Sequence, residues 1–396
     1  MHKNSVPRLR FQGFAGEWER KTLGELGHCV SGVGFPESEQ GGVNGIPFFK
    51  VSDMNLSDNE VILKKANHYV TEVQIAKRKW QPIEQLPCIF FAKVGAALLL
   101  NRKRLVYQHF LLDNNTMAFI MNNGLNDYFI KTLFDTIELP ELAQTGALPS
   151  INAKDVENVS VLIPPPPEEQ TALGDFFRRL DETLAQARAR LAKTQQLKRA
   201  MLAKLFPAHG ETAPKLRFKG FSGDWERKVL GEVVNVFDNL RIPVAENARI
   251  AGSTPYFGAN GIQDYVDGFT HDGEFVLIAE DGANDLQNYP VQYFNGKGWV
   301  NNHAHVLQGK PEFLNNLFLF SRFQSMDISR FLVGGGRAKL NGSTMLEIEI
   351  EFPKDKKEQT AIGNFFQKLD QTLALQSAAL EKLTRLKKAL LAAMLV

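Results

Sequence analysis

The sequence predicts an α+β protein with an internal duplication, in which two dissimilar mixed α/β domains alternate with two long helices. Three observations predict this class. One segment recurs halfway along the chain, a second recurs near its end, and each copy of the second opens a stretch with coiled-coil periodicity. We therefore expect a first variable domain at 1–167, a helix at 168–206, a second variable domain at 207–352 and a helix at 353–396.

The duplication is visible in two pairs of matching segments. Residues 7–25 match residues 214–232 at an offset of 207, with 14 identities in 19 positions. Residues 169–177 (EQTALGDFF) match residues 358–366 (EQTAIGNFF) at an offset of 189. Two matches in the same order indicate a tandem duplication. The segments between them show no obvious similarity, so we expect a repeated frame that carries two different inserts.

The repeated helices are predicted from apolar residues that alternate in steps of four and three, which is the coiled-coil period. The seam residues are Phe177, Leu180, Leu184 and Leu191 in the first helix and Phe366, Leu369, Leu373 and Leu380 in the second. Lys198 and Lys387 interrupt the seam, and we expect the neighbouring Leu197 and Leu386 to take over there. At ~1.5 Å per residue each helix would be a rod of roughly 58 Å. The alternative, two core helices of one globular domain, fits this length less well.

The inserts show the alternation and punctuation of mixed α/β domains. Alternating apolar residues predict strands at 159–163 and 346–350, each leading to a proline and then to a long helix. Glycines at Gly41–Gly42, Gly258–Gly261 and Gly334–Gly336 predict turns or loops.

Composition predicts a cytoplasmic globular protein. The chain has 396 residues, 44% of them hydrophobic and 10% aromatic, and a formal net charge of +2. Its start has no apolar run, so we expect no signal peptide, and the longest apolar candidate for a membrane span, Cys88–Leu100, contains Lys93. The two cysteines, Cys29 and Cys88, are too few for a disulfide framework or a four-ligand zinc site.

No sequence motif for catalysis, a cofactor or a metal is found. Glycine precedes Lys297 and Lys310, but neither lysine is followed by the serine or threonine of a phosphate-binding loop. Glu19-Arg20-Lys21 lacks the upstream acid of a nuclease. The alternating pair His303 and His305 could bind a metal, but packing or hydrogen bonding is the better interpretation because no acidic or cysteine partner is near in sequence. We expect a non-catalytic protein without a cofactor.

At this point the chain resembles the specificity (S) subunit of type I restriction–modification systems. The resemblance is carried by Phe-x-Gly-x-Trp at Phe14 and Phe221, by Leu-Gly-Glu at Leu23 and Leu230, and by the Glu-Gln pair that starts each long helix. The duplicated order of these motifs is more specific than any one of them.

The resemblance implies a DNA-recognition function. Each variable domain would be a target recognition domain that binds half of a bipartite, asymmetric site in double-stranded DNA. The two helices would pair as an antiparallel coiled coil on a pseudo-two-fold frame and would set the distance between the domains. Two modification (methyltransferase) subunits would dock on this frame, two ATP-dependent restriction subunits would join them, and no membrane is involved.

Candidate DNA-binding residues follow from the side chains that read base edges and phosphates, chiefly Arg, Lys, Asn and Gln. In the first domain they are Lys50, Asn101, Arg102, Lys103, Arg104 and Gln144, and in the second they are Tyr256, Asn260, Arg337 and Lys339. A solvated basic turn at 102–104 and a packing role for Tyr256 are the alternatives. The loops at 146–149 and 334–339 lie at similar distances from their helices and are expected to correspond.

Charge is distributed unevenly along the chain. Residues 233–352 carry eight basic and fourteen acidic side chains, whereas residues 353–396 carry eight basic and four acidic ones. We therefore expect weak charge-driven DNA binding by the chain alone. The competing interpretations are a coiled-coil scaffold whose globular domains bind other proteins, and a self-sufficient DNA enzyme.

Overall fold

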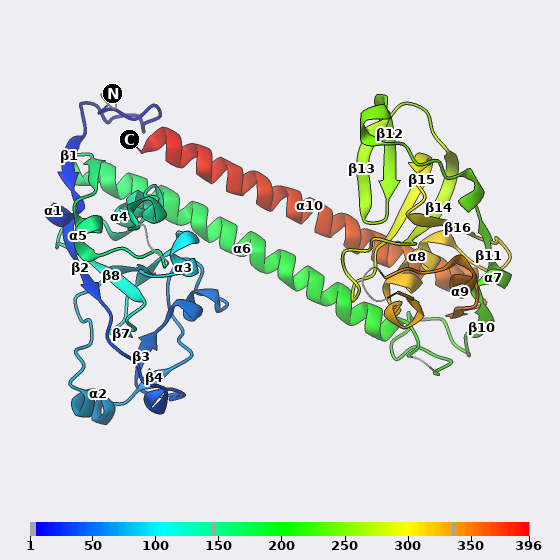
Figure 1. The fold of residues 1–396 in the computed structure, drawn as a ribbon, viewed down its shortest axis with the longest axis horizontal. Coiled ribbons are helices and arrows are strands. Elements are labelled where there is room, and N and C mark those ends of the chain that lie inside the picture. The colour runs from blue at the N-terminus through cyan, green and yellow to red at the C-terminus, as the bar shows by residue number, and fades with distance from the viewer. Residues whose placement is uncertain (1–4, 145–147, 209, 335–337, 396) are drawn as a thin grey trace. The chain divides into compact units, whose positions relative to one another are not determined.

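The computed structural model describes residues 5–144, 148–208, 210–334 and 338–395, which form two compact units (Figure 1). Unit 1 comprises residues 1–189 and 378–396, and unit 2 comprises residues 190–377. Each unit therefore contains one variable domain, the beginning of one long helix and the end of the other.

A short antiparallel strand pair frames each variable domain. In unit 1, β1 (Glu19–Thr22) pairs with β9 (Ser160–Ile163), and in unit 2, β10 (Glu226–Val229) pairs with β17 (Glu349–Phe352). The strand predicted at 159–163 is thus found in β9. The strand predicted at 346–350 begins later, because Leu346 ends the short helix α9 and pairing with β10 starts at Glu349.

Unit 1 contains a four-stranded antiparallel sheet in the order β2-β8-β5-β6 and a three-stranded sheet in the order β4-β3-β7. Its strands are β2 (Gly27–Ser31), β3 (Ile46–Phe49), β4 (Tyr69–Val70), β5 (Cys88–Ala92), β6 (Lys103–Val106), β7 (Leu111–Leu112) and β8 (Thr116–Met121). Its helices before the long one are α1 (Leu23–Leu26), α2 (Glu72–Arg78), α3 (Ala96–Leu99), α4 (Asp127–Asp135) and α5 (Ala153–Glu157).

Unit 2 contains one six-stranded sheet in the order β11-β16-β14-β15-β12-β13. Its strands are β11 (Val234–Val236), β12 (Ala251–Gly258), β13 (Gly261–Val266), β14 (His271–Ala279), β15 (Val291–Val300) and β16 (Ala304–Gly309). Its helices before the long one are α7 (Leu230–Val233), α8 (Asn316–Gln324) and α9 (Gly342–Leu346). The predicted turn at Gly258–Gly261 is confirmed, since it joins β12 to β13.

The two units share one strand order despite their dissimilar sequences. The order β2-β8-β5-β6 of unit 1 corresponds to β11-β16-β14-β15 of unit 2. In unit 1, β3 pairs in parallel with β7, and in unit 2, β12 pairs in parallel with the end of β15. The long strand β15 therefore takes the places of both β6 and β7, which explains why, besides the framing strand pair, the described part of unit 1 has two sheets and that of unit 2 has one.

The repeated motif at the start of each long helix holds the frame together. The guanidinium of Arg10 binds both carboxylate oxygens of Glu169 at 2.7 Å, and Arg217 binds those of Glu358 at the same distances. Both glutamates are buried, and a bidentate pair is the strongest geometry for such a contact. This contact gives a structural reason for the recurrence of Arg and Glu at matched positions.

A glycine in the same motif lets a short helix approach the long one. A Cβ atom on Gly174 would lie 2.2 Å from the side-chain oxygen of Asn126, which caps the start of α4. A Cβ atom on Gly363 would lie 2.8 Å from Cβ of Leu317 at the start of α8. Any larger side chain at these positions would push α4 or α8 away from the core.

The long helices are α6 (Pro167–Leu205) and α10 (Lys356–Met394), each of 39 residues. The predicted seam positions are all buried or half-buried. In unit 1, α6 and α10 are joined by an ion pair at 2.5 Å between Oδ1 of Asp181 and Nζ of Lys387. In unit 2, Asp370 and Lys198 make the matching pair, since each residue is 189 positions from its counterpart.

These pairs correct the prediction for the interrupted seam. Leu197 and Leu386 do not take over there, because their side chains are 46% and 47% exposed. The lysines themselves occupy the seam, where each is neutralised by an aspartate of the other helix.

Candidate nucleic-acid interface

A rim of loops lies at one end of the main sheet of unit 1, where β5 ends and β8 begins. We call it rim 1 and define it as Lys93, Val94, Asp113, Asn115, Gln144 and Ser150. The backbone N–H of Lys93 donates to the carbonyl of Asn115 at 2.8 Å, and its carbonyl accepts from Ile151 at 3.1 Å. A bridge between Gln144 and Ser150 closes the loop that joins them.

Unit 2 has a rim with the same backbone bonds. Rim 2 is defined as Glu280, Asp281, Asn301, His303, Val333 and Lys339. The N–H of Glu280 donates to the carbonyl of His303 at 2.8 Å, and its carbonyl accepts from Leu340 at 2.7 Å. A bridge between Val333 and Lys339 closes the loop.

A turn of the same kind leads into β8 and β16. The side-chain oxygen of Asp113 accepts the N–H of Asn115 at 3.3 Å, and that of Asn301 accepts the N–H of His303 at 2.8 Å. Such turns are typical of Asn and Asp, whose short side chains bond the backbone two residues on. The six rim positions therefore match in chain order, and the residue differs at every one of them.

The expected correspondence between the loops at 146–149 and 334–339 agrees with these bonds. In both loops the bridged residues are six positions apart, 144 with 150 and 333 with 339, and one further bridge ties each loop to a residue that follows β5 or β14. The backbone framework is therefore matched between the two units, whereas the side chains that it carries are not.

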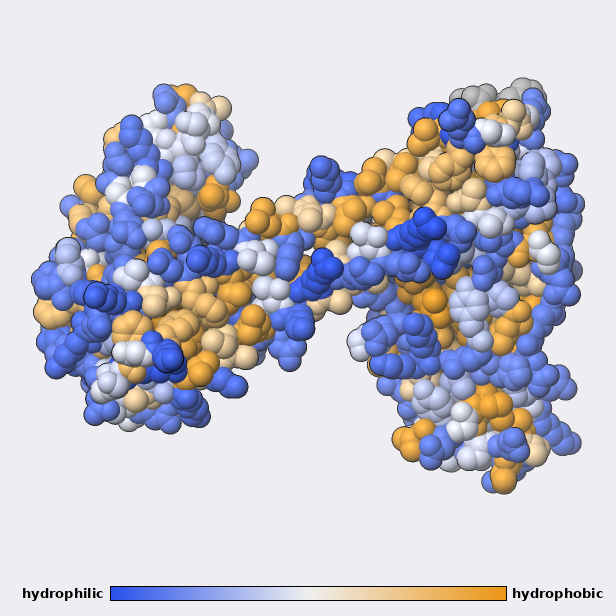
Figure 2. Space-filling model, turned by 180° about the vertical axis from the view of Figure 1, so that it is seen from behind, coloured by the Kyte–Doolittle hydropathy of each residue, from blue (hydrophilic) through white to orange (hydrophobic). Residues whose placement is uncertain are grey.

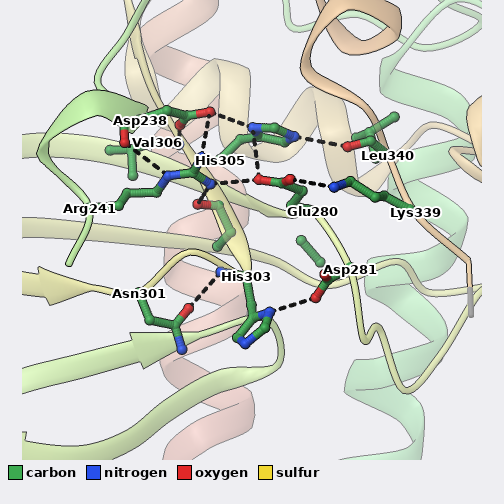
Figure 3. A network of polar contacts seen from close by, with 12 residues as sticks. Asp238, Arg241, Glu280, Asp281, Asn301, His303, His305, Val306, Lys339 and Leu340 are labelled. Atoms are coloured by element: carbon green, nitrogen blue, oxygen red, sulfur yellow. Dashed lines mark hydrogen bonds and ion pairs between the residues drawn. The ribbon is translucent and has the colours of Figure 1, made fainter. Parts of the chain in front are cut away.

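A network of charged side chains includes Glu280 and Lys339 of rim 2 (Figure 3). The guanidinium of Arg241 donates to Glu280 at 2.7 Å and to the carbonyl of Ala304 at 2.9 Å, and it lies 3.4 Å from Asp238. The ammonium of Lys339 lies 2.9 Å from the other oxygen of Glu280. These contacts attach the end of the loop 333–339 to β14 and to the segment after β11.

His305 completes this network, and its hydrogen-bond partners favour the protonated form of its ring. Its Nδ1 lies 2.5 Å from a carboxylate oxygen of Asp238, and its Nε2 lies 2.9 Å from the carbonyl of Leu340. Both partners only accept hydrogen bonds, so both ring nitrogens must carry hydrogens. Burial alone would lower the pKa of His305, but Asp238 and the Leu340 carbonyl outweigh burial and raise it.

Three residues of the network could in principle hold a metal ion. One ligand atom from each of Asp238, Glu280 and His305 lies within 4.8 Å of the others. The charges are nevertheless balanced by side chains, because Arg241 and Lys339 bind the carboxylates and His305 has no free lone pair when both nitrogens are protonated. The geometry therefore describes an ion network that holds rim 2 in place.

The predicted basic turn of the first domain faces a cavity of about 610 Å³ in unit 1. Residues 101–104 line one side, and Lys131, Arg188 and Lys387 contribute cations from three helices. The guanidinium of Arg102 donates to the side-chain oxygen of Asn55 at 2.5 Å. The structure thus gathers the turn with other cations in a recess rather than on the rim.

Several of the predicted residues are used inside their domains. The ammonium of Lys103 is buried and donates to the carbonyl of Ile137 and to Asn101, both at 2.6 Å, and burial lowers the pKa of Lys103 to about 8. Arg104 donates to the carbonyl of Asn59 at 2.6 Å, and burial lowers its pKa to about 10. These contacts favour structural roles, which differ from the predicted contacts with DNA.

Tyr256 is also buried, with 1% of its surface exposed. Its hydroxyl bonds the backbone of Val244, and the guanidinium of Arg249 lies 4.3 Å from the ring centre. The packing alternative therefore describes Tyr256 better than a DNA contact does. Lys50 is half-buried and donates to the side chain of Gln40 at 3.2 Å.

Three further predicted residues lie on or beside the rims. Gln144 is exposed on rim 1, and Lys339 is part of rim 2. Asn260 is exposed in the β12–β13 turn and donates to the carbonyl of Gly282, next to rim 2, at 2.9 Å. Arg337 lies outside the described residues.

Comparison with known proteins places these features in a family. The model of a family described as "Type I restriction modification DNA specificity domain" matches residues 15–196 and 222–385. The two matches cover most of the chain and include both rims. The chain belongs to the type I restriction–modification specificity family.

Relatives and solved structures of this specificity family agree with the match. A putative type I restriction enzyme specificity subunit from Haemophilus influenzae is 49% identical over 135 residues, which are 34% of each chain. The specificity subunit of the EcoprrI type I restriction enzyme of Escherichia coli is 24% identical over 323 residues, 79% of this chain and 77% of the relative. The crystal structure of a type I restriction–modification S subunit from M. genitalium has the same fold, with a TM-score of 0.70, 16% identity and 99% coverage of both chains.

The two rims contain residues that the sequence alone did not single out. Asn115 and Lys93 in unit 1 match His303 and Glu280 in unit 2 only through backbone bonds, and these pairs share no sequence signal. Their loops differ in length between the units, so the offset drifts from 187 to 189 along the rim. The alternation of His303 and His305 is visible in the sequence. Their acidic partners, Asp281 and Asp238, are distant in sequence. Within the described residues, no helix is long and apolar enough to cross a membrane.

Proposed function

We propose that this chain is the DNA-recognition subunit of a type I restriction–modification complex, and that each unit recognises one half of a bipartite, asymmetric DNA site. The observation that carries the proposal is the pair of matched rims. The two rims share one backbone framework, and at each of its six positions unit 1 and unit 2 present different residues. Sequence-specific DNA recognition depends on side chains placed on a rigid framework, so different side chains predict different half-sites.

The long helices are proposed to pair as an antiparallel coiled coil on a pseudo-two-fold frame and to set the gap between the half-sites. The ion pairs Asp181–Lys387 and Asp370–Lys198 support antiparallel pairing, because the sums of the two residue numbers are equal. Helices of roughly 58 Å are longer than one turn of DNA, ~34–36 Å, and leave surface for partners. The proposed domain boundaries are 1–167, 168–206, 207–352 and 353–396.

Two modification subunits are proposed to dock on the helices, and two restriction subunits to join the complex. Leu197 and Leu386 support two equivalent docking places, because they are 189 positions apart and equally exposed. Hydrophobic residues are visible among hydrophilic ones on the helical surface in Figure 2. Docked subunits would cover these leucines and remove their apolar surface from water. We propose a cytoplasmic, non-catalytic subunit without a cofactor of its own.

The proposal predicts that DNA binding needs the assembled complex. The variable part of unit 2 is acidic, so the isolated chain is expected to bind its duplex site at least about a hundredfold more weakly than the complex with its methyltransferase partner does. Fluorescence anisotropy on one labelled duplex at fixed salt measures both affinities. A scaffold whose domains bind only proteins would retain no DNA in either form, and tight, specific binding by the chain alone would contradict the proposed division of labour.

A further inference from the structure

One position on each rim presents a hydrogen-bonding side chain that the structure orients and leaves accessible. Asn115 in unit 1 and His303 in unit 2 both follow a turn made by a buried polar residue, Asp113 or Asn301. Asn115 is exposed, and the side chain of His303 is 38% exposed. They therefore occupy corresponding places at the starts of β8 and β16.

The ring of His303 is oriented by a carboxylate. Its Nδ1 lies 2.6 Å from an oxygen of Asp281, and because a carboxylate only accepts, Nδ1 carries the hydrogen. Figure 3 shows the other ring nitrogen pointing away from the ion network around His305. The Nε2 edge can donate a hydrogen bond when protonated or accept one when neutral.

The amide of Asn115 is oriented in a similar way. Its Nδ2 donates to a carboxylate oxygen of Asp113 at 3.2 Å. One N–H of the amide group is used in this bond, and the amide still has a second N–H and an oxygen. A paired N–H and oxygen match the N7 and N6 edge of adenine in the major groove.

The other rim pairs do not offer such a side chain in both units. Asp113 and Asn301 are buried and make the turns. Val94 and Val333 cannot form side-chain hydrogen bonds, and Glu280 and Lys339 are bound to each other. Only the pair Asn115 and His303 combines accessibility with a fixed orientation in both units.

We propose that Asn115 and His303 are the corresponding base-reading residues of the two half-sites, each contacting one base edge in the major groove of duplex DNA. This inference rests on the proposed function. Nε2 of His303 binds a hydrogen-bond acceptor or donor on the edge of a base, and the side-chain amide of Asn115 binds the edge of adenine. Loss of either contact is expected to reduce discrimination at one base position by about tenfold or more.

The test uses the chain assembled with its methyltransferase partner and a duplex library with randomised positions in and around the wild-type site. Sequencing of the methylated fraction gives base discrimination at each position for the wild type, Asn115→Ala and His303→Ala. Asn115→Ala is expected to relax one position in one half-site, and His303→Ala one position in the other half-site. Each variant is the matched control for the other.

Two further variants separate base reading from a general loss of structure. His303→Asn keeps a hydrogen-bonding group and is expected to change the preferred base, whereas Asn115→Asp removes the donors and is expected to lose adenine. Active alanine variants with an unchanged site, or changes in the same half-site, would overturn the inference while the wild-type split site still stands. A wild-type complex without a split site would instead overturn the proposed function.

Discussion

Replacing Asp181 by asparagine is expected to lower the free energy of unfolding by about 3 kcal/mol, because it removes a buried charge that two lysines share. The carboxylate of Asp181 lies 3.1 Å from Nζ of Lys131 and 2.5 Å from Nζ of Lys387, and it accepts the hydroxyl of Tyr128 at 2.8 Å. Asparagine cannot neutralise either ammonium group, and Asp135 would be left as the remaining acidic partner of both.

The matched control is Asp370→Asn in unit 2. Asp370 pairs with Lys198, and its side chain is 30% exposed, compared with 6% for Asp181. Solvent screens such a pair, so Asp370→Asn is expected to lower the free energy of unfolding by at most about 1 kcal/mol. Urea unfolding followed by circular dichroism measures both losses. Equal losses, or no loss for Asp181→Asn, would contradict the role given to the buried network.

The same carboxylate gives unit 1 a dependence on pH. Burial would raise the pKa of Asp181, but Lys131 and Lys387 outweigh burial and hold it below its usual value. A carboxyl group whose pKa is lower in the folded state stabilises the fold above the unfolded pKa, about 3.9, and this contribution is lost as the pH falls through the folded value. The difference in stability between wild type and Asp181→Asn is therefore expected to shrink in acid.

Aspartate at both Leu197 and Leu386 is expected to abolish binding of the methyltransferase partner. The two leucines are at matched positions and lie in different units, so each would contact one copy of the partner. A charge in the centre of a hydrophobic interface costs several kcal/mol, which is enough to release the bound copy. Native mass spectrometry is expected to show two bound copies for the wild type, one for either single variant and none for the double variant.

Leu375 provides the control for this prediction. It is 73% exposed on α10, but its counterpart 189 positions earlier is Gln186, so it is not part of a matched pair of leucines. Leu375→Asp is expected to retain two copies. Two copies on the Leu197→Asp, Leu386→Asp double variant would show that docking uses another surface.

The frame of the protein could be predicted from the sequence because its signals are local or repeated. Apolar spacing predicted both long helices, and glycines predicted the turn between β12 and β13. The partial burial of Lys198 and Lys387 in the seam could not be predicted, because each lysine is paired with an aspartate of the other helix, Asp370 or Asp181. Nothing local indicates that Leu197 and Leu386 face solvent instead.

Gln144 and Lys339 were predicted, but the other rim residues were beyond sequence analysis for a physical reason. Their equivalence is a property of backbone hydrogen bonds between β5, β8 and the loop that follows η3 (Leu139–Leu142) in unit 1, and between the corresponding elements in unit 2. Residue type alone does not show that Lys103 and Tyr256 are buried, since a cation or an aromatic ring can serve the core as well as DNA. Burial separates the two roles only when the fold is known.

The most direct test of the central claim is a genome-wide map of methylated adenines in cells with and without the gene for this chain. If each unit recognises one half-site, deletion removes methylation at one split motif, with two unlike halves and a gap of fixed length. Loss of a contiguous or palindromic motif, or loss of no motif, would contradict the claim that two dissimilar readers share this frame.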